Sequence, residues 1–225
     1  MEELLKNISD STISKGIYTI QEAALYSRVS SKTLHRWFVG NNDGNKIITS
    51  ENELLRYKFI GFLDFVQTLA IRAIRQQYKI NLAKIREGIE KAQDEYGIDY
   101  PFARKHVTMT DGKEIFIYQN DDLINLTGKR SGQYNLRKIV EMYLEDLCFD
   151  NEGYANSWTP SPGIILDPKI RFGEPVVQGC GITAFTLYEA AQVEGSYESV
   201  AEIFEIELEH VKIAYKYFDS LKNAA

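Results

Sequence analysis

The sequence predicts a mainly α protein of the α+β class, in which helices are combined with short antiparallel hairpins. Three observations favour this fold. Apolar residues recur at helical spacing over residues 54–78, and Ser, Thr or Asn stands at the expected start of several shorter helices. An Asp-Gly pair at 111–112 divides two segments that have the period of strands. With 225 residues, 44% of them hydrophobic and 26% charged, the chain is long and apolar enough for a sizeable core.

The first predicted elements are two short helices separated by a tight break. Thr19, followed three residues later by Glu22, forms a capping box, so a helix should begin directly after the threonine. Ser30 is the expected cap of a second helix over residues 31–38. The polar residues 1–16 lack periodicity, and we expect them to form an N-terminal arm.

A turn and two longer helices come next. Residues 40–45 read Gly-Asn-Asn-Asp-Gly-Asn and are followed by Lys and two isoleucines, which predicts a hairpin or wing. A long amphipathic helix is predicted over residues 54–78. Asn81 then caps a further helix, which should end near Gly97 because glycine accepts the left-handed conformation that closes many helices.

After Pro101 the hydrophobic period changes from that of a helix to that of strands. A hairpin is predicted around residues 111–112, with a third strand at 123–127. An amphipathic helix is predicted over residues 136–147. Cys148 falls on the apolar side of this helix, so we expect it in the core.

The C-terminal part begins after the best linker candidate, residues 151–162, which contain one glycine and two prolines. Short apolar runs follow, and Cys180 lies in a turn, where we expect it to be the more exposed cysteine. Thr183 and Ser196 are the expected caps of two helices, and a last helix should cover residues 207–221. The predicted domains are an N-terminal arm (1–16), a helix-turn-helix domain (17–100), a hairpin and helix connector (101–157) and a trihelical domain (158–225).

Charge is divided unevenly along the chain. Residues 1–98 hold 14 Lys and Arg against 12 Asp and Glu, a balance of +2, whereas residues 99–225 hold 12 against 20, a balance of −8. The net charge of −6 is therefore a poor guide to partners, because a DNA-binding surface needs only a local basic face. If nucleic acid is bound, we expect the first half to bind it.

The chain lacks the marks of a secreted or membrane protein. No run approaches the roughly 18 to 20 apolar residues of a membrane span, and residues 1–6 do not resemble a signal peptide. The two cysteines form no CxxC pair, which argues against a disulfide framework. We expect a cytoplasmic protein without a membrane partner.

The two short helices after residue 18 have the spacing of a helix-turn-helix. Ala23 and Ala24 allow close approach of the helices, and the second helix offers short donors and cations suited to phosphates and base edges. The alternative is that two short capped helices simply belong to an α-rich core, with their polar residues solvated.

The order of elements over residues 17–98, together with the run Thr33-Leu34-His35-Arg36-Trp37 before the wing, resembles the winged-helix domain of MerR-type regulators. Excisionases share that fold. The resemblance implies operator binding, with the second helix in the groove and the wing at the phosphates. The expected DNA-binding residues are Arg28, Ser31, Lys32, Thr33, His35, Arg36, Asn41, Asn42, Asn45 and Lys46.

Residues 167–182 are similar to the signature of the domain-of-unknown-function family 433, which runs Asp-Pro, Gly-x-Pro-Val and Gly-Thr-Arg-Ile before three short helices. Cys180-Gly181 stands here where Thr-Arg is usual. The resemblance implies an antitoxin of the VapB class, in a subgroup that also has the N-terminal MerR-like domain, and a PIN-like ribonuclease toxin as partner. The expected partner-binding residues are Asp167, Arg171, Phe172, Glu198, Glu202 and Glu205.

No enzyme, metal or cofactor chemistry is predicted. The three histidines lie far apart in sequence without a neighbouring ligand, and the acidic pairs lack an accompanying nucleophile or glycine-rich loop. The C-terminal glutamates would repel phosphate, so a protein surface is the expected partner there, either a second copy or a basic toxin. The alternative is an acidic solvated face without a partner.

The function that these observations favour is a homodimeric antitoxin that represses its own operon and masks a ribonuclease. A MerR-like DNA-binding transcriptional regulator without a toxin partner would share every N-terminal feature. A protein-interaction module that uses the helix pair only as a scaffold is the third possibility.

Overall fold

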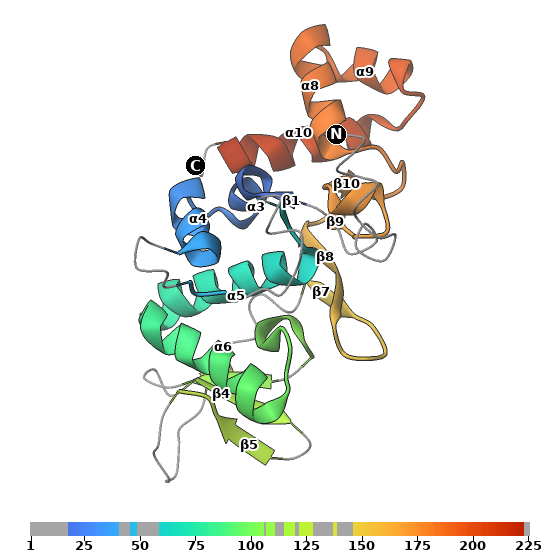
Figure 1. The fold of residues 1–225 in the computed structure, drawn as a ribbon. Helices are drawn as coiled ribbons and strands as arrows, with labels where there is room; N and C mark the ends of the chain where they lie inside the picture. Colours follow the sequence, from blue (N-terminus) through green and yellow to red (C-terminus); the bar gives the residue numbers. More distant parts are fainter. Residues whose placement is uncertain are drawn as a thin grey trace, which may run out of the picture.

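The computed structural model describes residues 18–40, 46–48, 59–105, 107–110, 115–119, 122–127, 137–138 and 146–222. Its longer helices form the body of the molecule, and small antiparallel sheets lie beside and below them (Figure 1). The helices are α3 (Ile20–Ser27), α4 (Ser31–Val39), α5 (Phe62–Tyr78), α6 (Leu82–Tyr96), α8 (Ala184–Glu194), α9 (Tyr197–Ile203) and α10 (Leu208–Lys222), with 3₁₀ turns η2 (Pro101–Ala103) and η3 (Arg171–Gly173). The predicted α+β class is confirmed.

The capping residues that the sequence predicts begin the helices as expected. In the Thr19 capping box, the Glu22 amide donates to Thr19 Oγ1 at 3.1 Å and the Thr19 amide donates to Glu22 Oε2 at 2.7 Å. The side chains of the other predicted caps each accept a backbone N–H of the first turn, and these are Ser30, Asn81, Thr183 and Ser196. These starts depend on local chemistry, which explains why the sequence predicts them well.

The long helix α5 begins at Phe62 rather than at residue 54. Before it, β2 (Phe59–Ile60) pairs antiparallel with β1 (Tyr18–Thr19), with Tyr18 opposite Ile60, and periodicity does not reveal a pairing between such distant residues. Residues 51–58 lie outside the described part of the chain.

The predicted hairpin around residues 111–112 is confirmed in its strands, with a third strand added on one side. The strands are β3 (Val107–Thr110), β4 (Ile115–Gln119) and β5 (Asp122–Asn125), and both pairings are antiparallel. The predicted helix over residues 136–147 is wrong at both ends, where the structure has β6 (Arg137–Lys138) and β7 (Leu147–Phe149). Strand β6 pairs with the free edge of β3. At residues 137–138, pairing with a distant strand therefore outweighs the apolar spacing that predicted a helix.

The linker predicted at residues 151–162 is also wrong, because most of it is β8 (Ala155–Ser161). This strand lies between β7 and β9 (Ile164–Leu166), and β10 (Val176–Val177) completes the sheet. The pairing of β8 with β9 is irregular between Trp158 and Ser161, and an irregular ladder tolerates Pro160. The sheet spans the predicted boundary at residue 158, and the division into domains remains a prediction.

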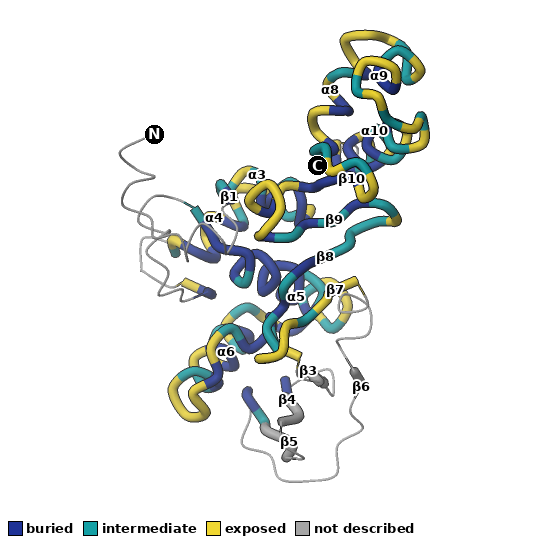
Figure 2. The backbone as a smooth tube through the Cα atoms, turned by 90° about the vertical axis from the view of Figure 1, so that its right-hand side faces the viewer, coloured by how far each residue is buried: buried dark blue, intermediate teal, exposed yellow. Residues whose placement is uncertain are grey.

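An aromatic core joins the N-terminal helices to this sheet. The Tyr18 ring lies 5.0 Å from Phe65 of α5, and Phe65 lies 5.5 Å from Trp158 of β8, between ring centroids. Figure 2 shows that α5 is buried over most of its length. The two cysteines are placed contrary to prediction, because Cys148 lies exposed in β7 and Cys180 packs half-buried against the core.

The C-terminal helices pack on each other, and α10 returns to the N-terminal pair. In Figure 1 α10 runs along α3 toward α4. Val211, Ala214, Phe218 and Leu221 of α10 are buried, and the Phe218 ring lies 5.7 Å from Tyr188 of α8. The end of α10 therefore lies beside the turn between α3 and α4.

Candidate DNA-binding and partner-binding surfaces

The α3–α4 pair buries one side of each helix against the other and the core. Ala23 of α3 and Leu34 of α4 are fully buried, and Trp37 and Phe38 of α4 lie beneath the surface. In the turn, Arg28 adopts a left-handed conformation with φ 53°, and its amide donates back to the end of α3. This conformation stops α3 and redirects the chain into α4 within three residues.

The opposite side of α4 carries polar and cationic side chains toward solvent. Ser31, Lys32, His35 and Arg36 are all exposed. Within the described part of the chain, neither Lys32 nor Arg36 forms an ion pair or a side-chain hydrogen bond. Both cations are therefore available to an anionic partner.

Thr33 has a different position from these residues. It is half-buried, its amide donates to Ser30 Oγ at 3.3 Å, and its hydroxyl lies 2.9 Å from the same serine oxygen. Thr33 thus takes part in the cap of α4.

Arg28 is held by the C-terminal helix. Its Nη2 donates to Ser220 Oγ at 3.1 Å, between residues 192 positions apart. Arg72 lies close by and donates from Nη1 to the Ser27 carbonyl at 3.0 Å. Burial, and secondly the charge of Arg28, lower the pKa of Arg72 from its usual value. A groove of about 400 Å³ lies here, with Gln21, Arg28, Ser31 and Leu221 in its lining.

The predicted wing is described only at its end. Lys46 is exposed, whereas Ile47 and Ile48 are buried, and their amides donate to the Trp37 carbonyl at 2.8 and 3.0 Å. Lys46 is thereby placed close to α4. Asn41, Asn42 and Asn45 lie outside the described residues.

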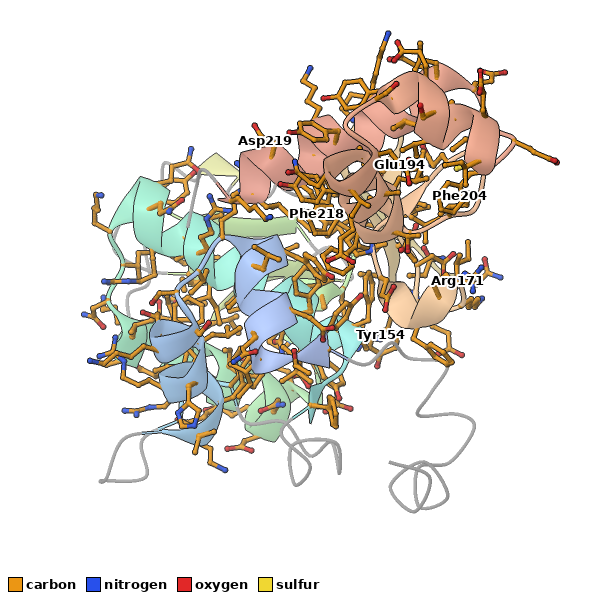
Figure 3. All side chains as sticks on the ribbon, turned by 90° about the horizontal axis from the view of Figure 1, so that it is seen from above. Tyr154, Arg171, Glu194, Phe204, Phe218 and Asp219 are labelled. Atoms are coloured by element: carbon orange, nitrogen blue, oxygen red, sulfur yellow. The ribbon has the colours of Figure 1, made fainter. Side chains whose placement is uncertain are left out.

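Three of the predicted partner-binding residues, Asp167, Arg171 and Phe172, lie in the loop between β9 and β10. Arg171 and Phe172 are exposed, Phe172 at 59%, and Figure 3 shows Arg171 at the edge of the molecule. Both have positive φ, 48° and 57°, which costs a non-glycine residue about 1–3 kcal/mol. The Asp167 carboxylate accepts the Lys169 amide at 2.8 Å, so Asp167 stabilises the turn that leads into this conformation.

The loop is fastened to the N-terminal helices through Tyr18. The buried Tyr18 hydroxyl donates to the Gly173 carbonyl at 2.8 Å. Gly173 has φ 89°, and a Cβ there would collide with the same hydroxyl, so only glycine fits. Burial, followed by the nearby Tyr26, raises the pKa of Tyr18 well above its usual value, which keeps the hydroxyl protonated as a donor.

The remaining predicted partner residues lie on α9 and just after it. Glu198, Glu202 and Glu205 are exposed, and Glu205 also has positive φ, 53°. The pKa of Glu198 is lowered, first by its own backbone N–H and then by Ser196, whose Oγ donates to Glu198 Oε2 at 3.0 Å. Among the described residues, no hydrogen bond or ion pair joins these glutamates to Asp167, Arg171 or Phe172.

Several surface features escape sequence reasoning. Val193 and Ile203 are exposed at 82% and 60%, yet on a helical pattern they resemble core residues. The Arg28–Ser220 and Tyr18–Gly173 bonds join residues too distant in sequence for any local signal. In the described part of the chain, no three His, Cys, Asp or Glu residues are grouped to hold a metal ion, and no helix is long and apolar enough to cross a membrane.

Comparison with known proteins gives a curated relative and a solved structure to which this chain is similar. No family model matches the chain, so its resemblance to MerR-type regulators and to family 433 remains a prediction. A protein of Mycobacterium tuberculosis (strain ATCC 25618 / H37Rv) named "Putative antitoxin VapB45" is 26% identical over 210 residues, covering 83% of this chain and 87% of that protein. The crystal structure of Rv2018 from Mycobacterium tuberculosis has the same fold, with a TM-score of 0.54 and 22% identity over 88% of this chain and 96% of that one. Over most of its length, this chain is therefore similar to a VapB-type antitoxin.

Proposed function

We propose that this protein is the antitoxin of a type II toxin–antitoxin module, which binds its operator DNA and neutralises a PIN-like ribonuclease toxin by direct contact. The similarity to an antitoxin over 83% of the chain carries the proposal. A function with two partners accounts for both candidate surfaces.

Operator binding is assigned to the exposed side of α4. Lys32 and Arg36, four residues apart on one helix, would neutralise phosphates or reach base edges, and His35 and Ser31 add shorter donors. Lys46 of the wing lies close enough to extend the contact along the backbone. The winged helix-turn-helix assignment is part of this proposal.

A homodimer follows from the small size of this surface. A single nine-residue recognition helix contacts few base pairs, whereas two copies on half-sites about one helical turn apart multiply the specificity. We propose that the protein binds a two-fold symmetric operator in this form.

The toxin is assigned to the C-terminal part. The exposed, strained residues Arg171 and Phe172 support this assignment, because strained backbone is retained where the displayed side chains have a use. Neutralisation would need no catalysis by this chain, only coverage of the ribonuclease active site.

The test has two arms. In the first, a labelled fragment carrying the promoter upstream of the chain's own gene is titrated with the protein in a mobility-shift assay at several salt concentrations. Retardation that weakens steeply with salt is expected, since binding releases counterions from the phosphates. In the second arm, the chain is coexpressed with the product of the adjacent reading frame. The two proteins should copurify, and the ribonuclease activity of that product should be suppressed in the complex.

The outcomes separate the candidate functions. Retardation without copurification would support a MerR-like transcriptional regulator that has no toxin partner, which the α4 surface allows equally well. Copurification without retardation would exclude operator binding and leave a protein-interaction module.

A further inference from the structure

The segment from α8 to the start of α10 has an extreme charge composition. Between residues 184 and 209 there is no Lys or Arg, but there are seven glutamates: Glu189, Glu194, Glu198, Glu202, Glu205, Glu207 and Glu209. None of them forms an ion pair with a described residue. The outer side of α8 and α9 is therefore strongly negative, and the cation that acts on Glu198 from within the described residues is Lys212 of α10, whose charge favours the ionised carboxylate without forming an ion pair.

The same outer side exposes large apolar side chains. Phe185, Glu189 and Val193 follow one another at four-residue spacing on the solvent side of α8, opposite the buried Leu187 and Ala191. Ile203 is exposed near the end of α9, next to Glu202. Figure 2 shows the outer turns of both helices exposed. Covering these exposed apolar residues is favourable only if the partner also supplies opposite charge for the carboxylates around them.

A groove lies where α8 and α9 meet, so this surface is not flat. The groove has a volume of about 430 Å³ and is lined by Gln192, Tyr197, Glu198 and Tyr215, among others. Gln192 Nε2 donates to the Tyr215 hydroxyl at 2.9 Å, and the Tyr197 and Tyr215 rings lie 5.1 Å apart, so its walls are set by contacts within the chain. Val193 follows Gln192 directly in α8.

We propose that the outer surface of α8 and α9, here called the acidic surface (Phe185, Glu189, Val193, Glu194, Glu198, Glu202 and Ile203), binds a basic protein surface, with Val193 and Ile203 as apolar anchors. The inference rests on the proposed function, because the partner it names is the toxin. It places the toxin contact on these two helices.

Charge selects this occupant over the others. A second copy docking by two-fold symmetry would bring the same carboxylates face to face, so the homodimer must use another surface. Nucleic acid and anionic lipid headgroups are repelled for the same reason. A basic protein would form ion pairs with the carboxylates and bury the apolar side chains in the same contact.

The test measures binding of the adjacent reading-frame product to the full chain by titration calorimetry and by association kinetics. Val193→Ser with Ile203→Ser should weaken binding roughly tenfold or more, since two exposed apolar side chains lose their burial. Glu198→Lys with Glu202→Lys should weaken it about a hundredfold, mainly by slowing association, and should remove most of its salt dependence.

Matched controls lie on α6, away from this surface. Tyr96→Ser removes an exposed aromatic residue, and Glu87→Lys with Glu95→Lys reverses two exposed carboxylates. Both controls should bind like the wild type, and thermal melts should show all variants folded.

The outcomes distinguish the two proposals. If the wild-type chain does not bind the adjacent product, the toxin half of the proposed function fails and this inference fails with it. If the wild type binds but both acidic-surface variants bind equally well, the inference alone is overturned. Loss of self-association in the Val193→Ser, Ile203→Ser variant, measured by sedimentation, would instead identify the surface as the dimer interface and also overturn it.

Discussion

The α3–α4 pair and the α9–α10 pair have the same local design and opposite charge. Each pair consists of a short helix capped by Thr or Ser, a tight break and a second helix. The break contains a residue in the left-handed conformation, which is Arg28 in the first pair and Glu205 in the second. The first pair presents Lys32 and Arg36 to solvent, whereas glutamates dominate the second up to Glu209. The comparison teaches that helix geometry alone does not select a partner, and that the surface residues decide it.

The two pairs nevertheless belong to one core. Tyr18, which precedes α3, bonds Gly173 in the loop before the C-terminal helices, and Arg28 bonds Ser220 near the end of α10. A change at either bond therefore tests whether the pairs are stable independently.

The largest effect is expected from reversing the cations of the first pair. Lys32→Glu with Arg36→Glu should lower affinity for the promoter fragment about a thousandfold, because two attractive contacts become repulsive, and should flatten its salt dependence. Mobility-shift titration measures both quantities.

The second pair supplies the control for this reversal. Lys212 and Lys216 are also exposed and four residues apart, on α10, so Lys212→Glu with Lys216→Glu changes the net charge equally. This variant should retain most of the affinity. Equal loss in the two variants would show that total charge, and not the α4 surface, governs binding.

The next largest effect is expected at the contact between Tyr18 and Gly173, which joins the N-terminal helices to the loop before β10. Gly173→Ala should lower the free energy of unfolding by about 3 kcal/mol, because alanine is strained at φ 89° and its Cβ collides with the Tyr18 hydroxyl. Urea unfolding followed by circular dichroism measures this loss. Gly181→Ala has positive φ, 70°, with open space around it, and should cost only about 1 kcal/mol. Similar losses in the two variants would contradict a specific role for the Tyr18 contact.

A smaller effect separates two buried tyrosines. Tyr18→Phe should cost about 1 kcal/mol, because the buried Gly173 carbonyl loses its donor. The Tyr217 hydroxyl is buried without a hydrogen-bond partner among the described residues, so Tyr217→Phe should change stability by less than about 0.5 kcal/mol. Thermal unfolding of both variants measures the difference. A larger loss of stability for Tyr217→Phe than for Tyr18→Phe would contradict the role given to the Tyr18–Gly173 hydrogen bond.

The smallest effect is a dependence on pH. Burial, and secondly the charge of Glu22, raise the pKa of Glu174 above 4.5, while Arg171 opposes the shift. The folded protein then binds more protons than the unfolded chain, so the free energy of unfolding falls as pH rises through the Glu174 pKa. Because this carboxyl is only partly buried and solvent screens its charge, we expect Glu174→Gln to raise stability by less than about 0.5 kcal/mol at about pH 7. The gain should disappear below about pH 4.5, and an equal gain at both pH values would contradict this cause.

The sequence predicted the helix starts well because a cap is a contact between residues two or three positions apart. Thr19, Ser30, Asn81, Thr183 and Ser196 all lie where these contacts form. It also predicted the β3–β4 hairpin. It failed at β6, β7 and β8, which stand at both ends of a predicted helix and in a predicted linker, because a strand depends on partners that are often distant in the chain.

The candidate surfaces divide in the same way. The sequence predicted which side of α4 faces solvent, since the spacing of Leu34, Trp37 and Phe38 determines it. It did not predict that Arg28 is held by Ser220, or that Val193 and Ile203 are exposed.

By itself, the sequence determined the local helices, their solvent sides and the separation of charge between the two halves of the chain, because each of these depends on residue type and short spacing. The tertiary structure alone decided that Tyr18 meets Gly173, that β8 joins two halves of a sheet, and that apolar side chains emerge amid the C-terminal glutamates. Those features depend on which distant segments pack together, and packing is a property of the whole folded chain.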